Sequence, residues 1–309
     1  MPFVSVVTGA SGFIGRHLVA ALLENGSEVY AVVRNAARAK TLLPKSERLH
    51  VLESTVGSDG AVSCGIPHGS DVMYHLAWSD SKPESRVDFG RQAKNIQMTL
   101  SYLRLAKESG VKKIVMAGST KEYLYCGTPI NKEARPTPGD AYGAVKVALR
   151  YLAGQFARQN GIAFNYAVIT GIYAADRKDN NVIFYTIDRL LKGERPSVTR
   201  LEQLWDYVYI DDAVEALRLI GEKGIDGMLY AVGHGDNWTL ANYVRIIHEK
   251  TDPSLPLGIG DVPYPSDIMP MSCMDLTDLT HDTGFVPKVS FEDGISRVIS
   301  QMKMELAGK

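Results

Sequence analysis

Residues Phe3–Gly15 read FVSVVTGASGFIG, a short apolar run that passes directly into a glycine-rich loop. An apolar face at helical spacing follows, formed by Ile14, Leu18, Ala21 and Leu22. A strand, a glycine loop and a helix in this order bring backbone N–H groups and a helix N-terminus to one point, where a phosphate binds well. A second strand, Glu28–Val33, follows at the distance that such a unit requires. The stretch therefore predicts a nucleotide-binding loop rather than an ordinary connection.

The first half of the chain alternates between strand-like runs and helical patterns. After the first two strands, we expect strands at residues 49–52, 71–76, 113–117 and 164–169. Helices are expected from about Val87 to Ser109 and from about Ala141 to Gln159, each followed by a glycine-containing turn. Such alternation produces a parallel sheet with helices on both faces, whose ligands lie at the carboxyl ends of the strands. The fold class is therefore α/β, a doubly wound parallel sheet.

The pattern loosens after Gly171, which indicates a smaller C-terminal lobe. A helix at Val182–Lys192 and a segment rich in proline and glycine at Pro253–Pro270 lie in this part of the chain. Two further strand-like runs, Tyr207–Ile210 and Met228–Val232, suggest that the chain returns to the first domain. We assign residues 1–170 and the returning segment 205–232 to the nucleotide-binding domain, and residues 171–204 and 233–309 to a substrate-binding lobe.

The composition restricts the class of protein. The 309 residues are 45% hydrophobic and 22% charged, with a net charge of −1 and no basic run, as in a globular enzyme and unlike a nucleic-acid-binding protein. The three cysteines, Cys64, Cys126 and Cys273, are too scattered for a disulfide framework or a metal site. We see no export signal and no apolar run long enough to span a bilayer. We therefore expect a cytoplasmic protein without a metal.

Tyr142 and Lys146 stand four residues apart at the start of the helix after the fifth strand, and hence on one face of it. A free phenol has a pKa of about 10, and a cation held beside it favours the phenolate. Ser119, at the carboxyl end of the fifth strand, and its neighbour Thr120 offer hydroxyls that can hydrogen-bond an oxygen gaining charge. Alone, such a Tyr–Lys pair also arises by chance on protein surfaces, and Ser119 would serve equally as a turn cap.

Together these motifs resemble the extended short-chain dehydrogenase/reductases, the group that contains nucleotide-sugar epimerases, dehydratases and 4-ketoreductases. The resemblance rests on the loop Thr8–Gly15, the strand end at Ser119 and the pair Tyr142 and Lys146. Four further segments resemble parts of the family pattern, namely Asp71–Ala77, Asn95, Trp205–Asp212 and Gly284–Gly294. The resemblance implies a Rossmann-type dinucleotide-binding domain with a smaller C-terminal substrate lobe.

The resemblance also implies roles for individual residues. Tyr142 would exchange a proton with a sugar hydroxyl or carbonyl at C4 while hydride passes to or from nicotinamide. Lys146 would hold the nicotinamide ribose and lower the pKa of the tyrosine, and Ser119 would orient the reacting oxygen. The expected catalytic residues are Ser119, Tyr142 and Lys146. The residues expected to bind the cofactor are Gly9, Ser11, Gly12, Phe13, Ile14, Gly15, Arg34, Leu76, Ala77, Asn95, Tyr142 and Lys146.

The end of the second strand discriminates between the two nicotinamide cofactors. An acidic residue there binds the adenosine ribose of NAD, whereas a cation accepts the additional phosphate of NADP. Here the strand ends Val33-Arg34-Asn35, and Arg38 follows one turn later. A guanidinium can bind a phosphate through two parallel hydrogen bonds. We therefore predict NADP, with NAD as the alternative; a solvated arginine at a loop start would have the same sequence.

The reactions of the family fit this chain to different degrees. Sugar dehydratases carry an Asp-Glu pair directly after the catalytic hydroxyl, whereas here Thr120-Lys121 stands there and Glu122 comes one place later. This departure argues against elimination. Epimerases of the group usually hold NAD tightly, whereas Arg34 suggests an exchangeable NADPH. We predict an NADPH-dependent reductase of a nucleotide-linked 4-keto sugar, with a nucleotide-sugar 4-epimerase as the alternative.

The substrate and the assembly are less constrained by the sequence. Trp205 stands where many relatives have an arginine for the substrate diphosphate, and Tyr173-Ala174-Ala175 replaces the family's Tyr-Gly-Pro. Arg177, Arg195 and Arg200 are the remaining candidates for phosphate ligands, although such arginines are more often surface charges. A ketone substrate without a nucleotide stays open. An NADP-sensing protein without catalysis is a further alternative, which the full set of catalytic residues disfavours. By resemblance, the two long helices suggest a homodimer joined by a four-helix bundle.

Overall fold

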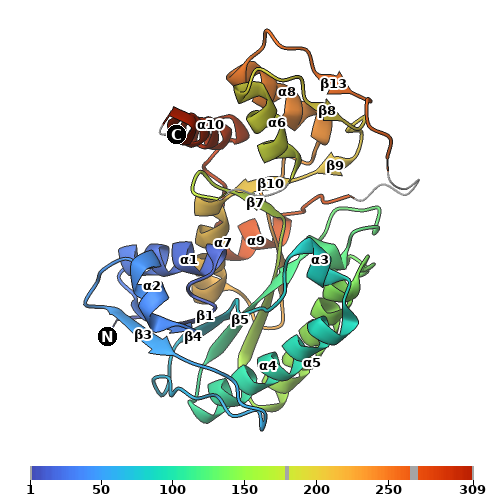
Figure 1. Ribbon diagram of the computed structural model, residues 1–309. Helices are drawn as coiled ribbons and strands as arrows, with labels where there is room; N and C mark the ends of the chain where they lie inside the picture. Colours follow the sequence, from blue (N-terminus) through green and yellow to red (C-terminus); the bar gives the residue numbers. More distant parts are fainter. Residues whose placement is uncertain (1, 178–180, 265–270, 308–309) are drawn as a thin grey trace.

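The computed structural model describes residues 2–177, 181–264 and 271–307, so residues 265–270 of the segment rich in proline and glycine lie outside it. Its main feature is a seven-stranded parallel sheet in the order β11-β6-β5-β4-β1-β2-β3 (Figure 1). The strands are β1 (Val4–Thr8), β2 (Glu28–Val33), β3 (Leu49–Glu53), β4 (Val72–His75), β5 (Lys113–Ser119), β6 (Ala163–Ile169) and β11 (Leu229–Val232). From β1 the chain adds β2 and β3 on one side, and it then returns to add β4, β5 and β6 on the other side. This change of direction leaves a crevice at the carboxyl ends of β1 and β4.

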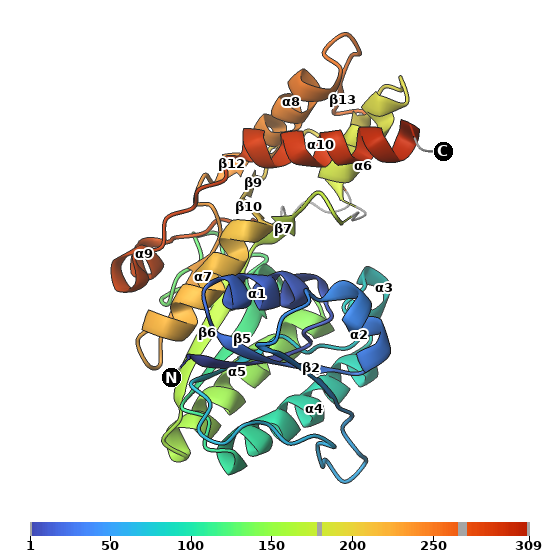
Figure 2. The same cartoon turned by 90° about the vertical axis from the view of Figure 1, so that its left-hand side faces the viewer.

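Helices cover both faces of this sheet. The helices α1 (Phe13–Glu24) and α7 (Ile210–Lys223) pack together on one face, with α2 (Ala36–Leu42) beside β3. The helices α4 (Phe89–Glu108) and α5 (Ala141–Gln159) pack together on the other face (Figure 2). The short helix α3 (Pro83–Arg86) precedes α4. The predicted α/β fold with a doubly wound parallel sheet is thus confirmed.

Alternation along the strands divides the core into two clusters. Val6 packs towards α4 and α5, whereas its neighbour Val7 packs towards α1 and α7. In β5, Ile114 belongs to the same cluster as Val6, and Val115 belongs to the same cluster as Val7. Successive side chains of a strand point to opposite faces, so the near-continuous apolar runs of these strands are what a sheet covered on both sides requires.

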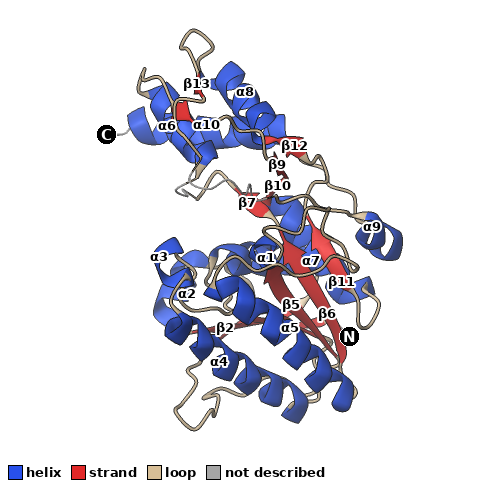
Figure 3. Ribbon diagram, turned by 90° about the vertical axis from the view of Figure 1, so that its right-hand side faces the viewer, coloured by secondary structure: helices blue, strands red, loops and turns tan. Residues whose placement is uncertain are grey.

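A smaller lobe stands over the carboxyl edge of the sheet (Figure 3). Its helices are α6 (Val182–Leu191), α8 (Leu240–Thr251) and α10 (Phe291–Ala307), and α10 contacts both of the others. Its short strands pair as β8 (Ser197–Val198) with β13 (Gly258–Ile259), and β9 (Leu204–Trp205) with β12 (Trp238–Thr239). The smaller C-terminal lobe of the predicted fold class is therefore present.

Some elements differ in place or extent from the expectations. The helix expected from Val87 begins at Phe89 because the Asp88 side chain accepts a hydrogen bond from Arg91 N and caps the helix. The strand β10 (Tyr207–Tyr209) pairs with β7 (Gly171–Tyr173) in a separate two-stranded sheet rather than with the main sheet. The helix α9 (Thr277–Thr283) contacts α7 and β11, so this part of the segment assigned to the second lobe lies against the nucleotide-binding domain.

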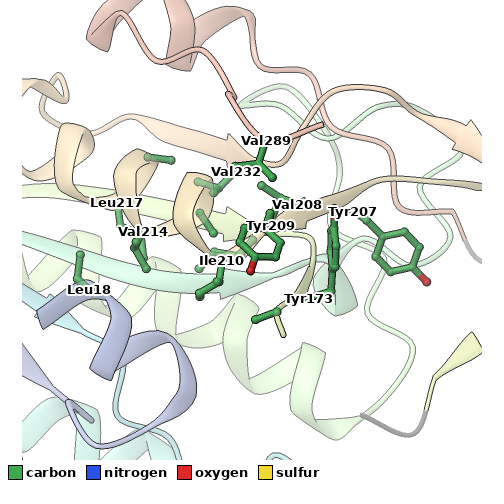
Figure 4. Close-up of a cluster of buried hydrophobic side chains, with 14 of the residues drawn as sticks. Leu18, Tyr173, Tyr207, Val208, Tyr209, Ile210, Val214, Leu217, Val232 and Val289 are labelled. Carbon is green, nitrogen blue, oxygen red and sulfur yellow. The ribbon is translucent and has the colours of Figure 1, made fainter. Parts of the chain in front are cut away.

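The returning segment joins the two parts of the molecule through a buried cluster. Figure 4 shows side chains of α1, α7, β7, β10 and β11 gathered there, with Val289 from the C-terminal segment. Asp212, buried in the first turn of α7, fixes that last segment because its carboxylate accepts hydrogen bonds from Lys288 N at 3.0 Å and Val289 N at 2.8 Å. One carboxylate thus satisfies two backbone donors of a segment without regular structure.

Replacing Asp212 with alanine is predicted to lower the free energy of unfolding by about 2–3 kcal/mol, because buried donors lose a charged acceptor. Urea unfolding measures this change. The matched control is Asp211→Ala, which removes an exposed ion pair with Arg297 and is predicted to change stability by less than about 0.5 kcal/mol. Equal effects of the two substitutions would contradict the role given to Asp212.

Candidate active site

The loop between β1 and α1 is shaped to receive an anion. Gly9 has φ +71°, and a side chain there would place its Cβ 2.8 Å from Ala77 N at the end of β4. A Cβ at Gly15 would stand 2.3 Å from Gly9 O, so helix and loop touch through backbone alone. Gly12 caps α1 without any side-chain hydrogen bond, and the first turn of the helix holds no acidic residue. The first N–H groups of α1 and its dipole are therefore available to a phosphate, so these residues fit a dinucleotide.

A cavity of about 820 Å³ opens from this loop along the carboxyl edge of the sheet. The predicted cofactor residues that line it are Gly9, Ser11, Gly12, Arg34, Leu76, Ala77 and Asn95. Phe13, Ile14 and Gly15 form the adjoining first turn of α1. Arg38, Ser54 and Thr55 also line the cavity, at the end of the crevice beyond β2. The structure thus gathers the loop and the second-strand arginines around one space.

Asn95 lines the cavity and also fixes the backbone of the loop after β4. Its buried side chain accepts a hydrogen bond from Ser79 N at 2.8 Å and donates one to Ser79 O at 3.2 Å. Gln92, one turn earlier in α4, donates to Asp80 O and Ser85 O. These two amides hold the loop after β4 in place. Gln92 was not singled out from the sequence, although it stands one helical turn before Asn95.

The three predicted catalytic residues lie together at the carboxyl end of β5. Tyr142 and Lys146 occupy the first turns of α5, which Asp140 caps by accepting a hydrogen bond from Gly143 N at 2.8 Å. Ser119 ends β5 and hydrogen-bonds the side chain of Tyr142. The Lys146 ammonium is buried and donates to Ala117 O at 2.7 Å. The face of α5 that carries Tyr142 and Lys146 is thus turned towards the carboxyl end of β5.

The acidity of Tyr142 differs from the expectation that a nearby lysine lowers it. Burial outweighs the other influences and raises the pKa of Tyr142 to about 12, and the hydrogen bond with Ser119 opposes the rise. The cation that also lowers this pKa is Arg86, whose guanidinium carbon lies 5.4 Å from the centre of the tyrosine ring. Tyr142 is therefore a protonated phenol at neutral pH in this structure.

Trp78 is a component of the site that the sequence reading missed. Its ring centre lies 3.9 Å from Lys146 Nζ and 5.3 Å from the ring centre of Tyr142. Its Nε1 donates to Gln92 Oε1 at 3.1 Å, and its side chain also lines the cavity. Trp78 therefore stands between the cavity and the catalytic pair, and it stabilises the buried ammonium through its ring face. The available signal was its position directly after Leu76-Ala77.

Glu122 is a second missed component. It is fully buried, and its Oε1 accepts hydrogen bonds from Ser119 N at 2.7 Å and from Tyr166 OH at 2.9 Å. Burial raises the pKa of Glu122, whereas burial lowers the pKa of Lys146 and the Glu122 carboxylate opposes that drop. In the sequence, Glu122 stands out only as an acid one place later than in the dehydratase pattern. Its hydrogen bond holds the Ser119 backbone, and its negative charge favours the charged form of Lys146.

The arginines considered as phosphate ligands have other contacts. Arg195 forms an ion pair with Asp261, and Arg200 Nε lies 3.3 Å from Glu202 Oε2. The Arg177 guanidinium carbon lies 4.1 Å from the ring centre of Phe13, close to the start of α1. Within the described ranges, no three His, Cys, Asp or Glu side chains form a metal-binding group. A search of those same ranges finds no helix with both the length and the apolar character of a membrane span.

This geometry agrees with comparisons to known proteins. The model of the NAD dependent epimerase/dehydratase family matches residues 5–233. The chain belongs to this family. UDP-glucose 4-epimerase of Azospirillum brasilense is 25% identical over 317 residues, covering 94% of this chain and 89% of that protein. The dTDP-4-dehydro-6-deoxyglucose reductase of Escherichia coli is 23% identical over 314 residues, covering 96% of this chain and 97% of that protein.

A solved structure with the same fold is UDP-N-acetylglucosamine 4-epimerase from Methanobrevibacter ruminantium M1 in complex with UDP-N-acetylmuramic acid. It is 22% identical, with a TM-score of 0.83 over 98% of this chain and 99% of that chain. Membership of the epimerase/dehydratase family confirms the resemblance found in the sequence and makes this chain an NAD(P)-dependent enzyme. The catalytic roles of Ser119, Tyr142 and Lys146 stay predictions.

Replacing Glu122 with glutamine is predicted to lower the pKa of Lys146, because the ammonium loses the carboxylate that favours its charged form. Glutamine still offers an oxygen to Ser119 N. NADPH binding is followed by cofactor fluorescence between about pH 6 and pH 10. As the pH rises, binding is expected to weaken in both proteins, and the midpoint of this loss should lie at a lower pH in the variant than in the parent. The control is Glu133→Gln, an exposed acid, whose profile stays that of the parent. An unchanged or upward shift in Glu122→Gln would refute the coupling.

Proposed function

We propose that this enzyme uses NADPH to reduce the C4 carbonyl of a nucleotide-linked sugar. The observation that carries the proposal is that Arg34 and Arg38 line the same cavity as Gly9, Ser11 and Gly12. The cavity thus joins a pyrophosphate-binding loop at one end to two cations at the other. A phosphate on the adenosine ribose would meet these guanidinium groups, and a guanidinium binds phosphate with charge-assisted hydrogen bonds. The neighbouring Asn35 is occupied in capping α2.

The arrangement at Tyr142 suits the protonation of a carbonyl oxygen. The dinucleotide, when bound, supplies the hydride. Tyr142, held as a protonated phenol by burial, can give its proton to a carbonyl oxygen that gains negative charge. Ser119 can donate a hydrogen bond to the same oxygen, because its hydroxyl lies beside the phenol. Lys146, whose ammonium is fixed between Ala117 O and Trp78, would hold the nicotinamide ribose. Trp78 lines the cavity and contacts both residues, so it lies where the cavity meets the catalytic pair.

The smaller lobe would bind the nucleotide end of the substrate, and the proposal includes a homodimer. The helices α4 and α5 pack side by side on one face of the sheet, and Tyr151 and Leu152 of α5 are 59% and 45% exposed. Large apolar side chains exposed at consecutive positions of a helix are typical of a surface that a second subunit covers.

Replacing Arg34 with aspartate is predicted to lower the ratio of kcat/KM for NADPH over that for NADH by roughly 10- to 100-fold, because a charge-assisted contact is worth about 1.5–3 kcal/mol. Steady-state kinetics with both cofactors measures the ratio. Lys40→Asp makes a similar charge change on the exposed side of α2, and its ratio is expected to match the parent. A ratio that is unchanged in Arg34→Asp would exclude the assignment of NADP.

A reductase consumes NADPH, whereas an epimerase returns the hydride and causes no net loss of NADPH. The purified protein is expected to oxidise one NADPH for each molecule of a nucleotide-linked 4-keto sugar, a loss followed by absorbance. Tyr142→Phe keeps the ring against Trp78 but loses the proton donor, so its rate should fall by about 100-fold or more. A sugar inverted at C4 without net loss of NADPH would instead identify an epimerase. Saturable NADPH binding with no turnover of any sugar would favour a non-catalytic sensor.

A further inference from the structure

A buried carboxylate outside the predicted catalytic set lies where the two lobes meet. Asp206 connects β9 of the smaller lobe to β10, and it is fully buried. His234 N donates to both of its carboxylate oxygens at 3.2 Å, and Gly235 N donates to its Oδ2 at 3.0 Å. These two donors belong to the segment that leads from β11 of the main sheet to β12 of the smaller lobe. The carboxylate thus joins two segments that run between the lobes.

The backbone of Asp206 is joined to two further connections. Thr170 Oγ1 donates to Asp206 O at 2.7 Å, and it lies 3.0 Å from Ser272 Oγ. Thr170 leads from β6 of the main sheet to β7, and Ser272 leads from the smaller lobe to α9. Both side chains are buried. Four segments that run between the lobes therefore meet at one polar cluster beside β7 and β10, which Figure 2 shows between the two lobes.

The cluster leaves little room for adjustment. A Cβ at Gly233 would stand 2.2 Å from Asp206 Oδ2, so the backbone after β11 lies directly against the carboxylate. Ser272 N also donates to Leu204 O at 3.3 Å, which holds the segment before α9 against β9. Because protein interiors are close-packed, a change at one buried group displaces its neighbours. A change at the Asp206 carboxylate is therefore passed on to the connecting segments.

The cluster also lies next to the strand end that carries the predicted catalytic serine. Ile169 is the Cα partner of Ser119 in the register of β5 and β6, and Thr170 follows Ile169. By contrast, the residues that line the cofactor cavity lie between Gly9 and Tyr102. A displacement at the cluster would therefore move the smaller lobe relative to Ser119 while leaving the walls of the cofactor cavity in place.

We propose that Asp206 is a positioning residue, whose carboxylate holds the connecting segments together and thereby sets the place of the smaller lobe relative to Tyr142. This inference rests on the proposed function, which places the nucleotide end of the substrate in that lobe. The sugar carbonyl reaches Tyr142 only when the lobes stand at the correct separation, because proton and hydride transfer require reacting atoms in close contact. Asp206 acts through the lobe rather than on the reacting atoms.

The charge of this carboxylate changes near neutral pH. Burial raises the pKa of Asp206 to about 7, and the hydrogen bonds from Gly235 N and His234 N oppose the rise. The titratable groups that face it come from the loop after β11, the segment before α9 and α8, and they are His234, Asp236, Cys273 and Tyr243. Below about pH 7 one oxygen carries a proton and accepts less well, so the segments are held less firmly.

The first test separates substrate positioning from cofactor binding. The full-length protein is assayed with NADPH and, as the probe, dTDP-4-keto-6-deoxyglucose. Asp206→Asn keeps the size of the side chain but turns a donor group towards the backbone N–H groups. Its kcat/KM for the sugar at about pH 8.5 is expected to fall by about 10-fold or more, because small misplacements of a substrate cost that much. The dissociation constant of NADPH, measured by cofactor fluorescence, should stay that of the parent.

The second readout is the pH dependence of the same comparison. The ratio of kcat/KM in the parent to that in Asp206→Asn is measured from about pH 6 to pH 9. Glu122 and Lys146 titrate in both proteins, so their effects cancel in the ratio. The ratio is expected to fall towards one below about pH 7, because the carboxyl of the parent is then uncharged as well. A constant ratio, or NADPH binding that weakens as much as kcat/KM, would overturn the proposal.

The control removes an acid elsewhere in the smaller lobe. The Asp188 side chain is exposed on α6 and pairs with Lys192, and Asp188→Asn should keep the kcat/KM of the parent at every pH. Thr170→Val serves if Asp206→Asn does not fold, because it removes only the hydroxyl between Asp206 O and Ser272 Oγ. Its kcat/KM should fall while NADPH binding is kept. An undiminished kcat/KM in that variant would count against the positioning role.

Failure of the proposed function gives a different result. If the parent turns over no nucleotide-linked 4-keto sugar, the substrate is wrong, and hydrogen exchange with NADPH bound tests the role of Asp206 without a substrate. Asp206→Asn should then speed exchange in all four connecting segments, at residues 170–173, 204–207, 233–238 and 271–275. Residues 9–15 of the glycine-rich loop should exchange as in the parent. Faster exchange confined to residues 234–235, or found in none of the segments, would refute this inference.

Discussion

Burial of the Lys146 ammonium is the constraint on which the catalytic end of the molecule depends. A charge taken out of water must be compensated where it lies, and each element that reaches Lys146 contributes. The strand β5 gives the carbonyl of Ala117, the loop after β4 gives the ring of Trp78, and the short helix η1 (Thr120–Glu122) gives the carboxylate of Glu122. These elements are also the ones that position Ser119 and Tyr142. The geometry of the site and the stability of its charge therefore have the same origin.

The sheet and its long helices were readable because their signals are local. The helix Ala141–Gln159 and the strand Glu28–Val33 have the predicted bounds, since a cap or a glycine ends each apolar pattern. The fold class and the family were therefore confirmed. The helix α9 was not predicted, because a short helix of seven residues takes its position from contacts with α7 and β11 that no local pattern encodes.

The candidate site shows the same division between local and tertiary information. The spacing of Tyr142 and Lys146 predicts that they share a helix face, and they do. The acidity of Tyr142 is set by burial under neighbours from other elements, so the expected lowering of its pKa was not found. Trp78 and Glu122 were missed for the same reason. Trp78 directly follows Leu76-Ala77, and Glu122 completes a Ser-x-x-Glu capping box with Ser119, but these positions do not show what the side chains contact. Each acquires its role only when β4, β5 and α5 come together.

The smaller lobe is built from segments that are far apart in the chain. The helix α10 packs against α6 and α8, and Phe291 and Ile295 of α10 belong to the same buried cluster as Ile187 of α6. During synthesis the ribosome delivers all strands of the main sheet before α10. The nucleotide-binding half can therefore form while the smaller lobe still lacks α10. In the growing chain, the sheet and its glycine-rich loop are therefore present before the last helix of the smaller lobe.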